Sequence, residues 1–146
     1  MAEDQLNTPI KVWYESMPGM PTNKWPLVKV KFSVLPQPIF ALVDSGASVS
    51  VLGPEVAYRL GYTKQKLGKP RFSGKSVSGE YKSWQLPETL SAEMYGFPLS
   101  FKFEVIDNLD LSWPCILGED SIFQMAGLDF SRFKGYFEIR FRKDLN

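Results

Sequence analysis

The chain has 146 residues, 44% hydrophobic and 23% charged, with a formal net charge of +1, which indicates one globular domain that binds neither nucleic acid nor membrane. It contains no histidine, which excludes Ser-His-Asp and Cys-His catalysis and every histidine-based zinc site. The single cysteine, Cys115, cannot form a thiolate cluster, so we expect no metal and assign any acid–base chemistry to carboxylates.

Residues 1–23 are rich in proline, methionine and charge and show little hydrophobic period. A Met-Pro-Gly-Met-Pro run near their end is a turn or linker signal. We therefore expect a flexible N-terminal arm here and a folded domain over residues 24–146. The alternative is that Val12, Trp13 and Tyr14 dock as a short strand. The segment lacks the pattern of a signal peptide, which favours a cytoplasmic location.

The first regular elements are short strands on either side of a continuous apolar run. Apolar and polar residues alternate over residues 28–32, which predicts a half-buried strand. Residues 39–43 are all apolar, as expected of a strand covered on both faces, and they end at an Asp-Ser-Gly triplet. Another short strand is expected over residues 48–52. Pro54 then opens a helix that ends at Gly61.

Strand patterns dominate the second half of the chain. Residues 70–92 predict two strands around a polar, glycine-containing tip, and residues 121–126 predict a short helix. Further strands or buried segments are expected over residues 101–105, 116–118, 128–133 and 136–141, the last two forming a hairpin. So many short strands at close spacing indicate an all-β barrel or sandwich with one or two short helices.

The run FALVDSGASVSVL, residues 40–52, carries the most unusual chemistry in the sequence. A buried strand brings the carboxyl group of Asp44 from the core to a strand end, and Gly46 permits the sharp turn that follows. An ordinary Asp-Ser-Gly turn is the plainer interpretation, because all three residue types favour turns. The wider sequence context favours a functional role.

Apolar-apolar-Asp-Ser-Gly-Ala resembles the active-site motif of the retropepsins, the aspartic proteases of retroviruses and LTR retrotransposons. A second element, PCILGED over residues 114–120, resembles that family's paired apolar-apolar-Gly segment, which a short helix follows. The polar hairpin expected between the two motifs resembles the flap that closes over bound peptide. The resemblance covers about residues 25–142 and implies a closed β-barrel with a flap hairpin, assembled as a homodimer.

The resemblance implies a mechanism that needs two copies of the chain. Each copy supplies one Asp44 carboxyl, and two carboxyls held close together share one proton, so that one acts as base and the other as acid. A water held between them would attack the scissile carbonyl. Ser45 would brace the two loops across the dimer axis. Gly46 and Ala47 would line the substrate floor, and Gly118 would permit tight packing beneath it.

The matched positions also imply the residues that bind substrate. The tip of the flap is expected at Val77, Ser78, Gly79 and Glu80. Ile116 and Leu117 are expected to form an apolar wall. A peptide would bind in an extended form, with its backbone paired to flap and floor and its side chains alternating into pockets. The resemblance implies no cofactor.

The sequence departs from the retropepsin pattern at the dimer contacts. Many retroviral members carry an acidic residue just after the Ala and an Arg just after the second Gly, where this chain has Ser48 and Glu119. The ion pair that supports those dimers cannot form here. We therefore expect a different dimer sheet, built from residues 128–133 and 136–141. The alternative is that these strands only cover the barrel of their own chain.

The sequence thus predicts an aspartic endopeptidase that acts as a homodimer on a peptide or polyprotein substrate, such as that of a retroelement, within the cytoplasm or a virus-like particle. A catalytically weak or inactive dimerisation or peptide-binding module with the same fold is the alternative. A β-barrel nucleotide hydrolase, which also uses Asp-Ser-Gly-like triplets, has less support because the chain has no glycine-rich phosphate loop.

Overall fold

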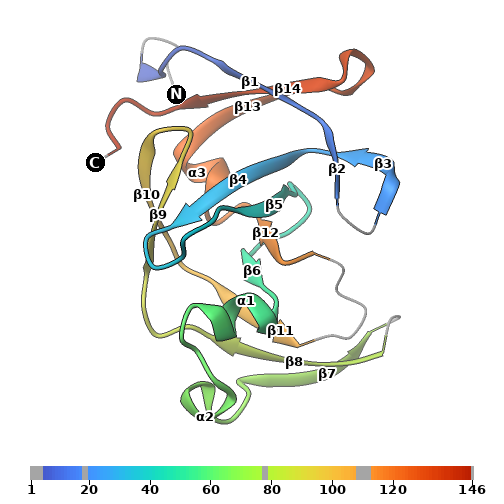
Figure 1. Ribbon diagram of the computed structural model, residues 1–146, viewed down its shortest axis with the longest axis vertical. Coiled ribbons are helices and arrows are strands. Elements are labelled where there is room, and N and C mark those ends of the chain that lie inside the picture. Colours follow the sequence, from blue (N-terminus) through green and yellow to red (C-terminus); the bar gives the residue numbers. More distant parts are fainter. Residues whose placement is uncertain (1–4, 18–19, 77–78, 108–112, 146) are drawn as a thin grey trace.

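The computed structural model describes residues 5–17, 20–76, 79–107 and 113–145, and strands dominate it (Figure 1). The largest sheet has nine strands, in the order β10 (Phe97–Phe101), β9 (Leu90–Met94), β4 (Leu27–Phe32), β5 (Ile39–Val43), β12 (Cys115–Leu117), β6 (Val51–Leu52), β11 (Glu104–Asp107), β8 (Gly79–Gln85) and β7 (Phe72–Ser76). A three-stranded sheet has the order β1 (Ile10–Trp13), β14 (Tyr136–Phe141) and β13 (Ala126–Ser131). The strands β2 (Glu15–Met17) and β3 (Met20–Trp25) form a two-stranded ribbon.

Short helices lie between the strands. The two helices expected from the sequence form as α1 (Pro54–Arg59) and α3 (Ile122–Met125). A third helix, α2 (Lys64–Leu67), was not predicted, because a single turn is too short to show a helical period. A 3₁₀ turn, η2 (Arg132–Lys134), joins β13 to β14. No helix in the described part of the chain is long and apolar enough to cross a membrane.

The nine-stranded sheet has an open order, with β10 and β7 as its two ends. The closed barrel that we expected is therefore not observed in the strand pairing of the described residues. β4 pairs with β5 along Leu27–Val30 but with β9 only at Lys31 and Phe32. The two end strands, β10 and β7, are not paired with each other.

Part of the expected flexible arm is in fact a docked strand. β1 pairs antiparallel with β14, and Val12 and Tyr14 are each only 8% exposed. The ring of Tyr14 lies 5.8 Å from that of Phe137, measured between centroids. The segment docks because its alternate side chains meet apolar partners on β14. This matches the alternative considered from the sequence, in which Val12, Trp13 and Tyr14 dock as a short strand. The division of the chain into residues 1–23 and 24–146 stays a prediction.

The predicted hairpin of residues 128–133 and 136–141 is confirmed as β13 and β14. β14 lies between β13 and β1 of the same chain, so both of its edges are already paired. Its buried face contributes Phe137, Ile139 and Phe141 to the core, each 0% exposed. The hairpin therefore does cover its own chain, and its pairing with a second copy through β14 is ruled out by the filled edges.

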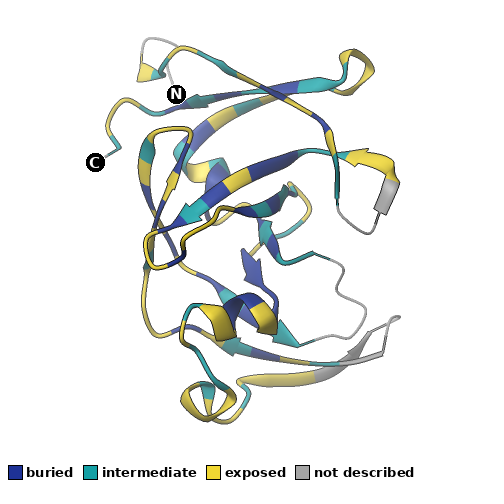
Figure 2. Cartoon of the chain, viewed as in Figure 1, coloured by how far each residue is buried: buried dark blue, intermediate teal, exposed yellow. Residues whose placement is uncertain are grey.

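One core is continuous through both larger sheets. Its largest fully buried side chains include Phe32, Phe101, Phe103, Phe137 and Phe141. Figure 2 shows buried residues along β4, β6 and β14, with exposed residues on the outer faces of α1 and β7. The rings of Phe32 and Phe103 lie 5.9 Å apart, and those of Phe101 and Phe103 lie 5.6 Å apart. These rings belong to the same core cluster as Val43, which precedes Asp44, and Leu117 of the second motif.

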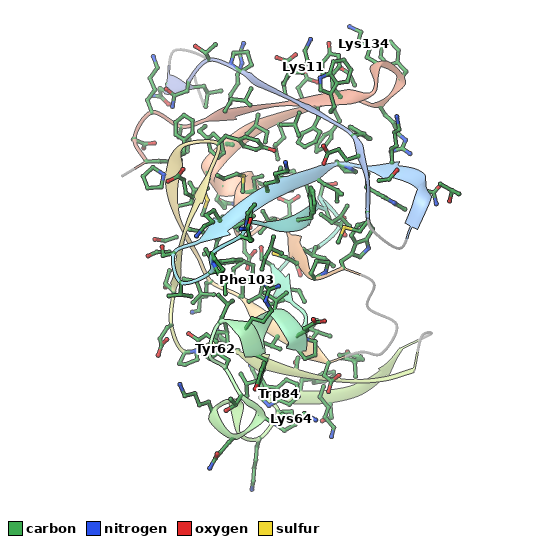
Figure 3. All side chains as sticks on the ribbon, viewed as in Figure 1. Lys11, Tyr62, Lys64, Trp84, Phe103 and Lys134 are labelled. Carbon is green, nitrogen blue, oxygen red and sulfur yellow. The ribbon has the colours of Figure 1, made fainter. Side chains whose placement is uncertain are left out.

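The β7–β8 hairpin predicted within residues 70–92 is confirmed, with pairing from Phe72–Ser83 to Ser76–Gly79. Two side-chain bonds hold the segment around α2 beside it, where Figure 3 labels Tyr62, Lys64 and Trp84. Trp84 donates its Nε1–H to the Gly68 carbonyl at 3.1 Å. Tyr62 donates its hydroxyl to Glu88 at 2.6 Å, and burial together with this partner raises the pKa of Tyr62 to about 12.

Candidate active site

Asp44 follows a strand that is held on both sides. β5 runs between β4 and β12, and its last residue, Val43, is 4% exposed and donates its N–H to the Pro26 carbonyl at 3.0 Å. The Asp44 N–H donates to the Leu117 carbonyl, also at 3.0 Å. The backbone of Asp44 is thus anchored to the second motif, while its side chain is half-buried.

The turn after Asp44 orients its carboxyl group. Gly46 donates its N–H to Oδ1 of Asp44 at 2.9 Å, and Ala47 donates its N–H to the Asp44 carbonyl at 3.2 Å. A Cβ atom at position 46 would lie 3.2 Å from Oδ1, so glycine suits this close approach. Oδ2 of Asp44 has no hydrogen-bond partner among the described residues, and Ser45 and Gly46 are exposed. One carboxyl oxygen is therefore fixed, and the other is free to bind a water or a substrate atom.

β12 places the second motif directly against this turn, because it runs parallel to β5 and antiparallel to β6. Glu119, just after the strand, donates its N–H to the Ala47 carbonyl at 2.8 Å. A Cβ atom at position 118 would lie 2.3 Å from that carbonyl oxygen. No side chain larger than a hydrogen atom fits there without a backbone shift. Gly118 therefore allows the two motifs to touch through their backbones.

A buried hydroxyl network also joins the two motifs, and sequence reasoning missed it. Ser50 is 0% exposed, and its Oγ accepts the N–H of Gly118 at 3.0 Å and donates to Oδ1 of Asp120 at 2.7 Å. Ser121, 1% exposed, places its own Oγ 2.6 Å from that of Ser50. Gly118 and Asp120 thus use one lone pair and the proton of the Ser50 hydroxyl, and the Ser121 hydroxyl, which also lies 3.4 Å from the Gly118 carbonyl oxygen, completes the network. A serine at an inward-facing position of a predicted strand was the only signal for it.

The predicted floor residues lie together, although they differ in exposure. Residues 44–47 form one turn, with Ala47 half-buried. Ile116 is half-buried beside them, whereas Leu117 is 0% exposed and belongs to the core. Leu117 therefore supports the floor from below in the single chain. Ser48 and Glu119, at the positions of the missing ion pair, are both exposed.

The predicted flap residues are only partly within the described structure. Gly79 is the first residue of β8 and pairs with Ser76 of β7. Val77 and Ser78, also expected at the tip, lie outside the described residues. β8 pairs with β11, which in turn pairs with β6. The β7–β8 hairpin therefore forms one end of the nine-stranded sheet, and β11 and β6 lie between it and β12 (Figure 1).

The chemistry available at this floor is that of a carboxyl group. Cys115 lies in β12 but is fully buried, and burial raises the pKa of its thiol, so it is a neutral packing residue. Within the described ranges, no three His, Cys, Asp or Glu residues lie close enough to hold a metal ion. Asp44 is the group that combines a fixed oxygen, partial exposure and an accessible turn.

Comparison with known proteins gives matches only at the level of structure. No family model matches the sequence, and no curated protein matches it either. The chain is similar to a retropepsin-like aspartic protease from Rickettsia conorii, with 22% identity and a TM-score of 0.64, over 90% of this chain and 98% of that chain. It is also similar to the retroviral protease-like domain of Ddi1 from Leishmania major, with 24% identity and a TM-score of 0.53, over 69% of this chain and 77% of that chain. This chain therefore has a retropepsin-like fold, as its two motifs predicted.

Proposed function

We propose that this protein is an aspartic endopeptidase that works as a homodimer and hydrolyses peptide bonds of an extended substrate. The observation that carries the proposal is the Asp44 carboxyl, which has Oδ1 fixed by the Gly46 N–H at 2.9 Å and Oδ2 without a partner among the described residues. A carboxyl presented in this way on an exposed turn suits the activation of a water molecule.

The chain contains a single Asp-Ser-Gly triplet, so a second copy must supply the second carboxyl. A two-fold axis beside the exposed turn would bring Asp44 and its symmetry mate together. The two carboxyls would then share one proton. The ionised carboxyl takes a proton from the bound water, whose oxygen attacks the peptide carbonyl, while the protonated carboxyl gives its proton to the developing oxyanion. The C–N bond then breaks as the carboxyl that took the water proton passes it to the leaving amine. The other carboxylate takes back a proton from the diol, which becomes the carboxylic acid product, so the pair again holds one proton.

The neighbouring residues have supporting roles in this proposal. Ser45, exposed on the turn, braces the two loops across the axis. Gly46 and Ala47 form the floor on which the substrate backbone lies, with half-buried Ile116 as an apolar wall. The β7–β8 hairpin with Gly79, and with Val77 and Ser78 at its tip, closes over the peptide. We propose a retroelement polyprotein, or the substrate of a domesticated descendant, as the natural target.

A peptide-binding module without turnover is the second candidate. It is favoured by Ser48 and Glu119, which cannot form the ion pair that supports many retroviral dimers. In this chain the same two segments are joined instead by the backbone bond from Glu119 to Ala47 at 2.8 Å. A measurement of turnover separates the two candidates.

The test is cleavage of a peptide library by the purified protein at about pH 4 to 6, where a carboxyl pair holds one proton. We expect cleavage that a statine-type inhibitor blocks. Asp44→Asn should lower the rate by roughly 100-fold or more, because it removes both the base and the acid. Asp129→Asn, an exposed carboxyl on β13, serves as the matched control and should leave the rate unchanged.

Cleavage that persists in Asp44→Asn would refute the mechanism. If the wild-type protein binds peptides but cleaves none of them, the second candidate, a peptide-binding module without catalytic activity, is supported instead. Circular dichroism of both variants should match the wild type, because each exchange is isosteric.

A further inference from the structure

A pocket of about 510 Å³ opens beside the segment that follows Asp44. Its apolar walls are Val49, Phe72, Tyr81 and Ile106, and its charged lining residues are Arg71 and Glu104. Val49 lies on the connection between the catalytic turn and β6, and it is 37% exposed. Through Val49 the pocket borders the segment that leads from the Asp44 turn to β6, and none of its lining residues was predicted as a site residue.

The sheet register explains why these residues share one face. Ser83 of β8 pairs with Phe72 on one side and with Ile106 on the other, so these side chains stand in a row across three strands. Trp84, the next residue, points to the opposite face and donates to the Gly68 carbonyl after α2, in the region that Figure 3 labels. Within the row, Phe72 is 51% exposed and Ile106 is half-buried, whereas Ser83 between them is 6% exposed.

The apolar walls are exposed in a way that suits a ligand. Phe72 is 51% exposed, and its ring lies 5.6 Å from the Tyr81 ring, measured between centroids. Phe72 and Val49 are two of the large hydrophobic residues that the folded chain leaves exposed, and both line this one pocket. A long side chain laid along them would bury apolar surface on both partners.

The two charged residues occupy different sides of β8. Arg71 precedes β7 and donates its Nη1–H to Oε1 of Gln85 at 2.8 Å. Gln85 pairs with Glu104 of β11, so it separates the guanidinium from the carboxylate. The Glu104 N–H donates to the Ser50 carbonyl at 3.0 Å, which ties this residue to the catalytic connection.

The carboxylate of Glu104 is the unsatisfied group of the pocket. It is half-buried, and it has no ion-pair or hydrogen-bond partner among the described residues. A partly buried carboxylate gains from a charged donor that replaces its lost water. Arg71 already has a side-chain acceptor, so it has less to gain from an acidic ligand.

We propose that this pocket selects a lysine or arginine side chain of the peptide substrate. The aliphatic stem lies along Val49 and Ile106, the aromatic wall of Phe72 faces the cation, and the charged group binds Glu104. The assignment rests on the proposed peptide-binding function, but it concerns specificity and does not require turnover. Repulsion from Arg71 across β8 is reduced by screening, whereas the contact with Glu104 is direct.

The experiment measures peptide binding to the Asp44→Asn protein, which is not expected to cleave its ligand. A fluorescent peptide selected from the library is compared with versions in which each basic residue in turn is replaced by norleucine, which keeps the stem and removes the charge. At one position we expect about fivefold weaker binding of the norleucine peptide, the effect of one partly exposed ion pair. The same comparison in Asp44→Asn, Glu104→Gln protein should show no difference between the two peptides.

Arg71→Gln on the same background is the matched control, and it should keep or slightly increase the preference for the basic peptide. A preference that survives Glu104→Gln, the absence of any basic preference, or selection of an acidic residue would each overturn the assignment. The proposed protease activity is tested by a separate measurement, because cleavage is assayed with the protein that retains Asp44 and peptide binding with Asp44→Asn.

Discussion

At the scale of single residues, Gly118 shows how closely the two motifs of the site approach each other. A Cβ atom there would lie 2.3 Å from the Ala47 carbonyl oxygen and 3.1 Å from the Ala47 Cβ. Two of the three atoms that it would meet belong to the backbone of Ala47, so they cannot rotate away. The position of the Asp44 turn therefore depends on a glycine in the second motif.

We predict that Gly118→Ala lowers the free energy of unfolding by about 3 kcal/mol, because overpacking against backbone forces the turn to move. The same shift should reduce any Asp44-dependent cleavage. Urea denaturation followed by tryptophan fluorescence measures the first effect. Gly127→Ala is the control, since its Cβ would make an ordinary contact of 3.5 Å with Leu6 and should change stability by less than about 0.5 kcal/mol. Equal stability of Gly118→Ala and wild type would contradict the packing described here.

Residue patterns predicted Asp44 but not Ser50. The apolar run before Asp44 and the Asp-Ser-Gly turn are adjacent in sequence, so their pattern is visible locally. The bonds of Ser50 reach Gly118, Asp120 and Ser121, at separations of 68 to 71 residues. A pattern of neighbours carries no information about partners so far along the chain. The hydroxyl network thus became visible only in the folded molecule.

At the scale of elements, local patterns succeeded where each element is defined by its own residues. Helix α1 begins at Pro54, and β7 and β8 pair as the polar, glycine-containing tip between them predicted. They failed for β1, whose stability comes from β14 at the other end of the chain. Val12 and Tyr14 have little to bury within their own segment, and they become buried only when β14 is present beside them.

We predict that Val12→Asp lowers the free energy of unfolding by roughly 3 kcal/mol, because it buries an unpaired charge under the three-stranded sheet. Lys11→Gln, on the opposite and exposed face of β1, should change it by less than about 1 kcal/mol. Chemical denaturation of both variants gives the comparison. If Val12→Asp proves as stable as wild type, β1 contributes nothing and residues 1–23 behave as the flexible arm first expected.

At the scale of the whole molecule, each chain presents one of the two carboxyl groups that the proposed mechanism needs. The chain presents one Asp44 on an exposed turn and has no second triplet. β14 has both edges filled by its own chain, whereas β13 keeps one unpaired edge within the described structure. Any contact between copies therefore uses surfaces other than the β14 edges, such as the turn at residues 44–47 itself.

We predict that the rate of peptide cleavage rises with the square of protein concentration when most chains are monomeric, and linearly once they are paired. Adding Asp44→Asn protein to wild type should reduce the rate, since mixed dimers carry one carboxyl. Analytical ultracentrifugation over the same concentrations checks the pairing independently. A rate per chain that stays constant on dilution into the monomeric range would show that one chain suffices, and the dimer mechanism would be abandoned.

The sequence by itself determined the local scaffold of this protein and pointed to its fold. The absence of histidine leaves carboxylates as the candidate catalytic groups, and the two apolar-then-glycine motifs pointed to Asp44 as the candidate and predicted the retropepsin-like fold that the structure has. Only the tertiary structure decided that β1 docks on β14, that Ser50 joins the two motifs, and that Glu104 lines a pocket together with Val49. The physical reason is that composition and hydrophobic period describe residues that are close together in the sequence. The three features above are contacts between residues that are far apart in the sequence and that only folding brings together.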